Sequence, residues 1–243
     1  MSTGRAKAQA WMCERLHITF PFVSMGNVDS WHLFADPEPQ IFALYQHHIG
    51  RWRRTLDIGA NLGLHSILMA KCGFEVKAYE PDFAHFDRLL ANLETNDVAE
   101  WVTPCMAAVA NANGEARFVR VMNNLTGNHL EGFKDSYGPR ESVIVPTVDC
   151  KALWAWADFA KIDCEGNEAA ILCDTSARDW QHLSAVVEVR NEANAAAIYR
   201  HMVALEVPLW SAKRDWERVK VFGDVPRANR EGPLYIGRDG PWA

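Results

Sequence analysis

From Arg54 onward, short runs rich in apolar residues are followed by longer stretches in which apolar residues recur every three or four positions. The short runs predict strands, and the helical spacing predicts helices that each bury one face. The predicted strands are residues 54–58, 75–80, 101–109, 116–122, 142–148, 158–163 and 184–189. The predicted helices are residues 64–72, 82–96, 166–173 and 192–205.

This alternation of strands and helices predicts an α/β fold with a mostly parallel sheet and helices on both of its faces. The end of the chain departs from the alternation. Residues 207–212 (VPLWSA) and 232–237 (GPLYIG) are joined by a charged loop, and this arrangement predicts an antiparallel hairpin at the edge of the sheet.

The first fifty residues follow a different pattern, and we divide the chain into an N-terminal segment, residues 1–50, and a main domain, residues 51–243. Residues 36–50 predict a helix with Asp36 as N-cap and Pro37 in its first turn. Residues 16–23 and 30–34 predict two short strands on either side of a turn at Gly26 and Asn27.

Composition and charge narrow the class of protein. At 243 residues with 49% hydrophobic and 23% charged residues, the chain is typical of a globular domain. A net charge of −6 disfavours a nucleic-acid partner, because such proteins usually present a basic surface. The sequence has no signal-peptide pattern and no apolar run of about 18 residues, so we expect a cytoplasmic location and no membrane partner. Six scattered cysteines without a CxxC pair argue against a zinc knuckle or a disulfide scaffold.

The stretch TLDIGANLG, residues 55–63, joins a predicted strand to a predicted helix through a glycine-containing turn. Ligands of open parallel sheets bind beyond the carboxyl ends of the strands. Gly59 and Gly63 lack a Cβ, so the backbone can turn tightly and approach a ligand, and the following helix offers free N–H groups. The pattern therefore favours a cofactor-binding turn.

Glu80 ends the next predicted strand about 20 residues after this turn, the spacing at which a carboxylate binds ribose hydroxyls. The turn lacks the middle glycine of the dinucleotide fingerprint GxGxxG, through which backbone meets a pyrophosphate. S-adenosylmethionine, which has no phosphate, is therefore the preferred cofactor. The alternative is a helix-packing turn beside an ordinary surface glutamate.

The segments DIGANLGLHSILMA, AYEPDFAHFDRLLANLETN, TVDC and FAKIDCEGNEAAIL together resemble the FkbM family of class I S-adenosylmethionine-dependent methyltransferases. The resemblance covers most of residues 55–189. It implies a seven-stranded sheet that ends in an antiparallel hairpin, and methyl transfer to a hydroxyl of a sugar, glycan or natural product. The residues assigned to the cofactor are Asp57, Gly59, Ala60, Asn61, Gly63, Glu80 and Pro81.

The chemistry requires a group that orients the acceptor hydroxyl and manages its proton. In FAKIDCEGNE, alternation places Lys161, Asp163 and Glu165 on one side of an extended run, and Glu188 ends the next predicted strand. Asp163 is our first choice for the residue nearest the methyl group, and Glu165 is the second. The alternative is that these acids cap the following helix, with Lys161 as their neutralising partner.

Residues 123–138, between two predicted strands, carry the polar, aromatic and glycine residues expected of an active-site lip. His129 in this segment is a further candidate base, because imidazole titrates near neutral pH. The alternative is a solvated loop histidine.

Two other readings stay open. The acids could hold Mg²⁺, which prefers carboxylate ligands, although Lys161 would oppose a nearby dication. The chain could instead bind the cofactor without turnover, as a partner subunit. We favour a metal-free enzyme with a small-molecule or glycan acceptor. The sequence leaves open the identity of the acceptor and whether the chain forms a homodimer.

Overall fold

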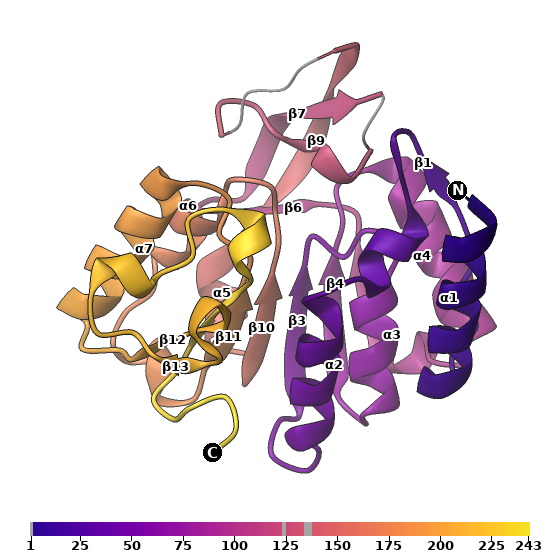
Figure 1. The fold of residues 1–243 in the computed structure, drawn as a ribbon. Coiled ribbons are helices and arrows are strands. Elements are labelled where there is room, and N and C mark those ends of the chain that lie inside the picture. The colour runs from indigo at the N-terminus through magenta and orange to yellow at the C-terminus, as the bar shows by residue number, and fades with distance from the viewer. Residues whose placement is uncertain (1, 123–124, 134–137) are drawn as a thin grey trace.

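The computed structural model describes residues 2–122, 125–133 and 138–243. Within these residues the main sheet has eight strands in the order β13-β12-β14-β11-β10-β3-β4-β5 (Figure 1). Their bounds are β3 Arg54–Ile58, β4 Glu75–Tyr79, β5 Val102–Cys105, β10 Phe159–Ile162, β11 Ser184–Val187, β12 Leu209–Ser211, β13 Glu217–Arg218 and β14 Leu234–Ile236.

The five strands from β5 to β11 are parallel, as the alternation predicts. The antiparallel pair at the end of the chain is also present, formed by β12 and β14. β14 inserts between β11 and β12 and runs antiparallel to both. The two-residue strand β13 pairs with the outer edge of β12 and so adds an eighth strand to the expected seven.

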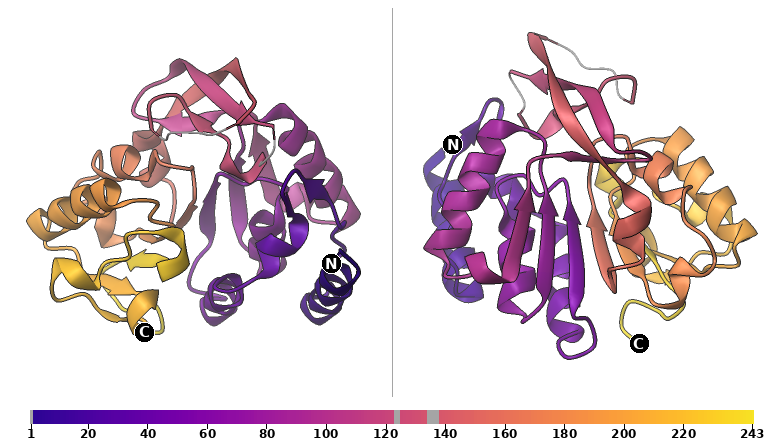
Figure 2. Two further views of the ribbon diagram at one scale, coloured as in Figure 1. Left: turned by 45° about the horizontal axis from the view of Figure 1, so that its top comes forward. Right: turned by 180° about the vertical axis from the view of Figure 1, so that it is seen from behind.

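Helices cover both faces of this sheet, and Figures 1 and 2 show the N-terminal helices and the later helices to either side of it. Alternate residues of the strands supply the two cores: Phe159 and Val186 pack with α1–α4, whereas Ala160 and Val187 pack with α5–α7. The helices are α1 Ser2–Leu16, α2 Glu38–His47, α3 Leu64–Lys71, α4 Phe83–Thr95, α5 Cys150–Trp154, α6 Glu168–Leu172 and α7 Glu192–Ala204.

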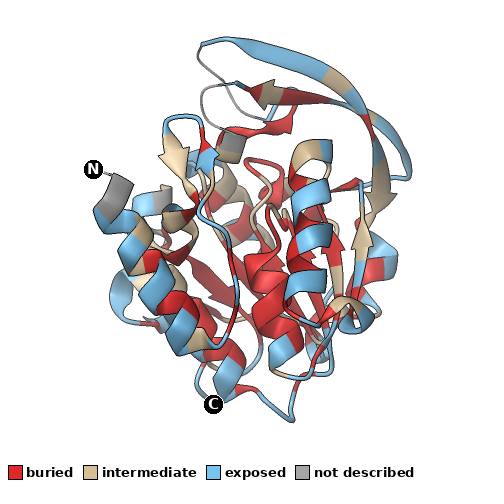
Figure 3. Ribbon diagram, turned by 90° about the vertical axis from the view of Figure 1, so that its right-hand side faces the viewer, coloured by how far each residue is buried: buried red, intermediate tan, exposed pale blue. Residues whose placement is uncertain are grey.

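The first fifty residues share the first of these cores. Phe34, Leu44 and Tyr45 are buried in the same cluster as Leu62 and Phe159 of the main domain. Figure 3 shows this burial as red on the strands and inner helix faces, with pale blue on the outer faces. The N-terminal segment is therefore packed against the main domain through a continuous apolar core.

The secondary structure of this segment differs from the prediction. Residues 2–16 form α1, and residues 30–34 form a 3-10 helix, η1 Ser30–Phe34, where a strand is predicted. The predicted turn at Gly26 is present, between β1 Ser24–Met25 and β2 Val28–Asp29. The remaining one-turn 3-10 helices are η2 Ala99–Trp101, η3 Leu125–Gly127, η4 Asp179–Gln181, η5 Ala212–Arg214, η6 Phe222–Asp224 and η7 Asn229–Glu231.

Residues 18–23 are extended but belong to no strand. Side chains take the place of a neighbouring strand. Asn96 accepts a hydrogen bond from Thr19 N at 2.8 Å and donates one to Thr19 O at 2.7 Å. Gln9 of α1 donates to the carbonyls of Phe20 and Pro21. The alternating pattern of this segment reflects alternating burial, and these side chains pair with backbone groups that would otherwise need a ladder.

A second sheet lies over the carboxyl ends of the parallel strands, at the top of Figure 1. Its strands are β6 Ala108–Ala110, β7 Gly114–Val121, β8 His129–Leu130 and β9 Arg140–Asp149, in the order β6-β9-β7-β8. β7 and β9 pair over eight residues as an antiparallel ribbon. β7 and β9 were predicted from the sequence, and β6 only as the end of a strand over residues 101–109, whereas β8 and the separate sheet were not predicted.

No helix in the described ranges has both the length and the hydrophobicity required to cross a bilayer.

Candidate active site

The glycine turn follows β3 and touches β10. Gly59 has φ +79°, a conformation that favours glycine, and its N–H and that of Ala60 both donate to Tyr79 O at 3.0 Å. A Cβ on Gly59 would lie 1.9 Å from the carbonyl oxygen of Asp163. The turn therefore needs glycine here both for its conformation and for its contact with the neighbouring strand.

The rest of the turn is held by α3 and by Glu80. Asn61 has φ +52°, and its N–H donates to Glu80 Oε2 at 2.8 Å. Gly63 has φ +86° and is the N-cap of α3. The positive φ values at residues 59, 61 and 63 fold the chain back so that the turn lies against the end of β4.

Glu80 follows β4 and is 5% exposed. Its two carboxylate oxygens each accept a backbone hydrogen bond of 2.8 Å, from Asn61 N and from Asp82 N. Burial raises the pKa of Glu80 to about 7 even though these hydrogen bonds favour the charged form. Glu80 is thus the carboxyl group that the glycine–glutamate spacing predicts, held at the turn.

These elements surround a pocket of about 580 Å³ at the carboxyl ends of β3, β4 and β10. Of the residues assigned to the cofactor, Gly59, Asn61, Glu80 and Pro81 line it. Asp163 and Glu165 from the predicted catalytic set also line it. We call it the turn pocket. It brings together the two sequence blocks that suggested cofactor binding and catalysis.

The other three residues assigned to the cofactor lie behind the lining of the turn pocket. Asp57 is fully buried, accepts a hydrogen bond of 2.6 Å from Ser66 Oγ and lies 3.7 Å from Lys161 Nζ. Ala60 and Gly63 shape the turn through the hydrogen bond from Gly63 N to Ala60 O. Their side of the turn faces the core, so their contribution is to its shape.

The acids predicted for the site meet around Arg190. Its Nη2 lies 2.6 Å from Asp163 Oδ1, 2.6 Å from Glu165 Oε1 and 3.0 Å from Glu188 Oε2. Lys161 Nζ lies 3.7 Å from Asp163 Oδ2. Arg190 was not selected from the sequence. The sequence does contain a signal for it, because Arg190 is the first basic residue after β11 and follows Glu188 by two residues.

Electrostatics divide these acids into different states. Burial alone would raise the pKa of Asp163, but Arg190 and Lys161 outweigh it and hold this pKa well below its usual range. Burial and the charge of Asp163 raise the pKa of Glu188 well above its usual range. Asp163 is therefore the acid that keeps its charge most firmly, whereas Glu188 is more readily protonated than an ordinary glutamate.

Glu165 and Glu168 differ in role. Glu165 has φ +58° and directs its carboxylate to Arg190 in the turn after β10. Glu168, fully buried, accepts hydrogen bonds from Cys164 N at 3.1 Å and from Gly166 N at 3.0 Å. Glu168 therefore ties down the turn at the start of α6, which is the capping role that we weighed for Asp163 and Glu165.

The predicted lip forms part of the turn pocket. Thr126, Asn128 and Leu130 line it, while residues 123–124 and 134–137 of the lip lie outside the described residues. Asn128 donates to Asp82 Oδ2 at 3.0 Å, and Arg120 of β7 lies 2.6 Å from the same oxygen. The second sheet is thereby fastened to the start of α4.

His129 lies in β8 and is 2% exposed. The alternative interpretation, a solvated loop histidine, is therefore wrong. Its Nδ1 lies 2.8 Å from Gly127 O. Among the described residues that line the turn pocket, both neighbours of His129 are present and His129 is not. The alternation of β8 points its ring away from the pocket.

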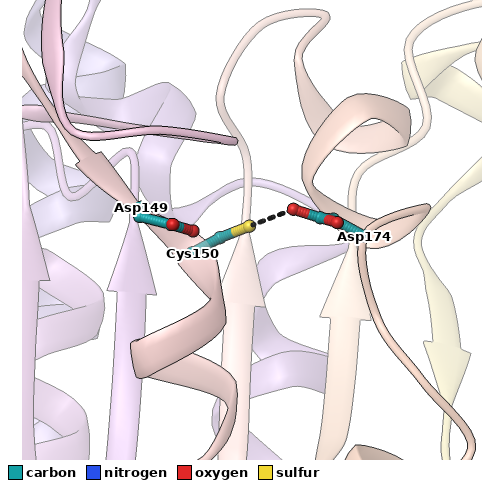
Figure 4. A group of neighbouring side chains, drawn as sticks. All are labelled: Asp149, Cys150 and Asp174. Atoms are coloured by element: carbon teal, nitrogen blue, oxygen red, sulfur yellow. Dashed lines mark hydrogen bonds between the residues drawn. The ribbon is translucent and has the colours of Figure 1, made fainter.

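A separate group of potential metal ligands comprises Asp149, Cys150 and Asp174 (Figure 4). Asp149 caps α5 by accepting from Lys151 N, and Lys151 Nζ lies 3.3 Å from Asp174 Oδ2. Cys150 Sγ lies 3.9 Å from Asp174, and burial raises its pKa to about 11. The three side chains thus have structural partners, and the thiol is protonated at neutral pH.

No protein-family model matches the chain, and none of the curated proteins matches it. Solved structures do. The METTL16 methyltransferase domain in a second crystal form aligns with a TM-score of 0.52 and 12% identity, over 97% of this chain and 79% of that one. The delta-N METTL16 methyltransferase domain gives 0.51 and 13% identity over 98% and 97%. A human methyltransferase 10 domain containing protein gives 0.51 and 12% identity over 98% of each chain. These likenesses show the fold, which is the α/β fold of class I methyltransferases.

Proposed function

We propose that the chain is an S-adenosylmethionine-dependent O-methyltransferase of the FkbM type. The observation that carries this proposal is the turn pocket, in which Gly59, Glu80 and Asp163 meet at the carboxyl ends of parallel strands. Ligands of open α/β sheets bind at this edge. The methyltransferase fold and the FkbM-like block KIDCEGNE agree with it.

The lining of the turn pocket fits a nucleoside-containing cofactor. Glu80 presents a carboxylate of the kind that binds ribose hydroxyls. Asn61 Oδ1 and His85 Nε2 are buried without hydrogen-bond partners in the described chain, and both residues line the pocket. Buried polar atoms without a partner are costly, so they favour a ligand with matching donors and acceptors. When bound, S-adenosylmethionine supplies a methyl group that is already activated on a sulfonium.

Asp163 would orient the acceptor hydroxyl toward that methyl group. Lys161 and Arg190 keep Asp163 ionised, so its oxygens can accept a hydrogen bond from the hydroxyl. The hydroxyl proton would become strongly acidic as its oxygen gained the methyl group. A carboxylate of low pKa is then basic enough to receive the proton.

The arrangement of charges favours a metal-free reaction. Arg190 and Lys161 already neutralise Asp163, Glu165 and Glu188 at ion-pair distances. A divalent cation at these acids would meet two positive groups at close range. We therefore propose that the residues themselves, and no Mg²⁺, orient the hydroxyl.

The test is formation of S-adenosylhomocysteine from S-adenosylmethionine across a panel of hydroxyl compounds, with and without a chelator. The proposal expects turnover with at least one acceptor, at a rate that the chelator leaves unchanged. Complete loss with chelator and recovery with Mg²⁺ would refute the metal-free route. Tight cofactor binding with no turnover on any acceptor would favour the partner-subunit alternative.

A further inference from the structure

A second pocket of about 350 Å³ adjoins the turn pocket, and Asp163 lines both. Its apolar wall consists of Pro37, Ile41, Ile162, Val186 and Pro233. These residues come from the start of α2, from β10 and β11, and from the residue before β14. We call this cavity the α2 pocket. This volume includes space that is open to solvent, so the enclosed part of the cavity suits only a compact ligand.

The charged residues of the α2 pocket are mostly acidic. Glu38, Asp163 and Glu188 line it together with Lys161. Arg190, the nearby cation, is already engaged by Asp163 and Glu188. An anionic ligand would therefore meet more negative than positive groups in this cavity, whereas a neutral hydroxyl could donate a hydrogen bond to a carboxylate.

Glu38 is fixed by the packing of α2 on α3. Its Oε2 lies 3.0 Å from His65 Nε2, and His65 Nδ1 lies 2.8 Å from the hydroxyl of the fully buried Tyr45. This chain of contacts restrains the Glu38 side chain. The acidic character of the pocket is thus a fixed feature of the folded chain rather than the result of a mobile surface residue.

We propose that the α2 pocket binds the methyl acceptor and that it takes a compact molecule with an apolar body and an uncharged hydroxyl. The assignment to the acceptor rests on the proposed methyltransferase function, because it uses the position of Asp163 between the two pockets. The apolar wall favours such a molecule over a bare sugar, whose surface is polar all round. The acidic lining disfavours an anion.

The experiment measures direct binding by ligand-observed NMR with three probes: benzyl alcohol, benzoate and methyl α-D-glucopyranoside. We expect benzyl alcohol to bind at least about fivefold more tightly than either of the others, because like charges repel even across water and the glucoside offers little apolar surface. Equal or tighter binding of benzoate or of the glucoside, or no binding of benzyl alcohol, would overturn the proposal.

Two variants locate the binding. Ile41→Phe extends a side chain that is 4% exposed and lines the cavity, and it should abolish binding of benzyl alcohol. Glu38→Gln removes one negative charge and should strengthen binding of benzoate, whereas Asp36→Asn removes the same charge from an exposed position and should not. Unchanged probe affinities in Glu38→Gln would place binding elsewhere, even if Ile41→Phe fails to fold.

Titration with S-adenosylhomocysteine separates this proposal from the proposed function. The variants of the α2 pocket should keep the cofactor affinity of the wild type, because neither Glu38 nor Ile41 lines the turn pocket. If the unmodified chain binds benzyl alcohol but not S-adenosylhomocysteine, the methyltransferase function is refuted and the α2 pocket stands as a small-molecule site of another kind. If the chain binds S-adenosylhomocysteine but binds the three probes equally, only the assignment of the acceptor to the α2 pocket is refuted.

Discussion

Glu80 links the fold to the proposed cofactor at the scale of a single residue. Its two oxygens hold the backbone of Asn61 and Asp82, and its pKa of about 7 lies within the physiological range because the side chain is buried. In the proposed complex the charged form accepts hydrogen bonds from ribose hydroxyls, whereas a protonated Glu80 would lose part of this acceptor capacity.

Cofactor affinity should therefore depend on pH. Protonation sets in as the pH falls below about 7, so binding of S-adenosylhomocysteine should weaken about tenfold between pH 8 and pH 6. Glu80→Gln should bind more weakly at pH 8, by about 1–3 kcal/mol, and its affinity should be nearly flat over the same range. Calorimetric titrations at several pH values measure both. The same pH dependence in the Gln variant would assign the titration to another group.

Asp163 is the residue at which the two pockets and the ion-pair cluster meet. Asp163→Asn keeps the size of the side chain but removes the charge that binds the acceptor proton. The methylation rate should fall by about 10²–10⁴-fold, while cofactor affinity stays within a few fold. Glu168→Gln, a neighbouring acid outside both pockets, serves as a control for general disturbance of the turn. A normal rate in Asp163→Asn would remove this residue from the mechanism.

At the scale of elements, the turn between β3 and α3 depends on the absence of a side chain at residue 59. Gly59 and Gly73 have nearly the same positive φ, +79° and +85°, but a Cβ on Gly73 would meet nothing within 4 Å. The two positions therefore separate the cost of the backbone conformation from the cost of a steric collision.

Gly73→Ala should destabilise the chain by about 1–2 kcal/mol, the cost of a left-handed conformation in a residue with a Cβ. Gly59→Ala carries the same cost and in addition forces β3 and β10 apart, which adds about 1–3 kcal/mol. It should also abolish cofactor binding. Denaturant unfolding of both variants gives the comparison, and equal loss of stability would mean that β10 yields to the added methyl group.

The second sheet is held to the main domain by Arg120 of β7 and Asp82 at the start of α4, 2.6 Å apart with the Asp82 side chain fully buried. Arg120→Ala leaves this carboxylate with fewer partners and should lower the free energy of unfolding by about 1.5–3 kcal/mol. Arg117→Ala is the matched control, because Arg117 lies on the same strand with 63% of its side chain exposed. It should change stability by less than about 0.5 kcal/mol. Similar effects of both variants would contradict this account of the anchor.

The elements that sequence patterns predicted well are those whose burial repeats locally. The strands and helices from β3 to α4 alternate as expected because each strand is followed directly by the helix that covers it. α1 escaped prediction because its buried face includes the polar Gln9 beside Met12 and Cys13. Residues 18–23 were predicted as a strand, but side chains of Gln9 and of the distant Asn96 supply hydrogen bonds that a neighbouring strand would otherwise make.

At the scale of the whole molecule, the same contrast between local patterns and contacts made only on folding decides which parts of the site could be predicted from the sequence. The glycine turn and Glu80 could be predicted because they are separated by a fixed spacing within one β-α-β unit. The α2 pocket could not be predicted, since it combines elements more than a hundred residues apart that meet only in the folded chain. Arg190 was missed because it reaches Asp163, 27 residues earlier, only through the pairing of β10 with β11. A net charge of −6 remains consistent with a small-molecule acceptor, which we propose over a nucleic acid.

The most direct test of the central claim is a calorimetric titration of the unmodified chain at pH 8 with S-adenosylhomocysteine and, in parallel, with a nicotinamide dinucleotide. The turn pocket combines Glu80 with a turn that lacks the glycine needed beside a pyrophosphate. We therefore predict saturable one-site binding of S-adenosylhomocysteine and at least tenfold weaker binding of the dinucleotide. Tighter binding of the dinucleotide, or no binding of S-adenosylhomocysteine, would contradict the claim.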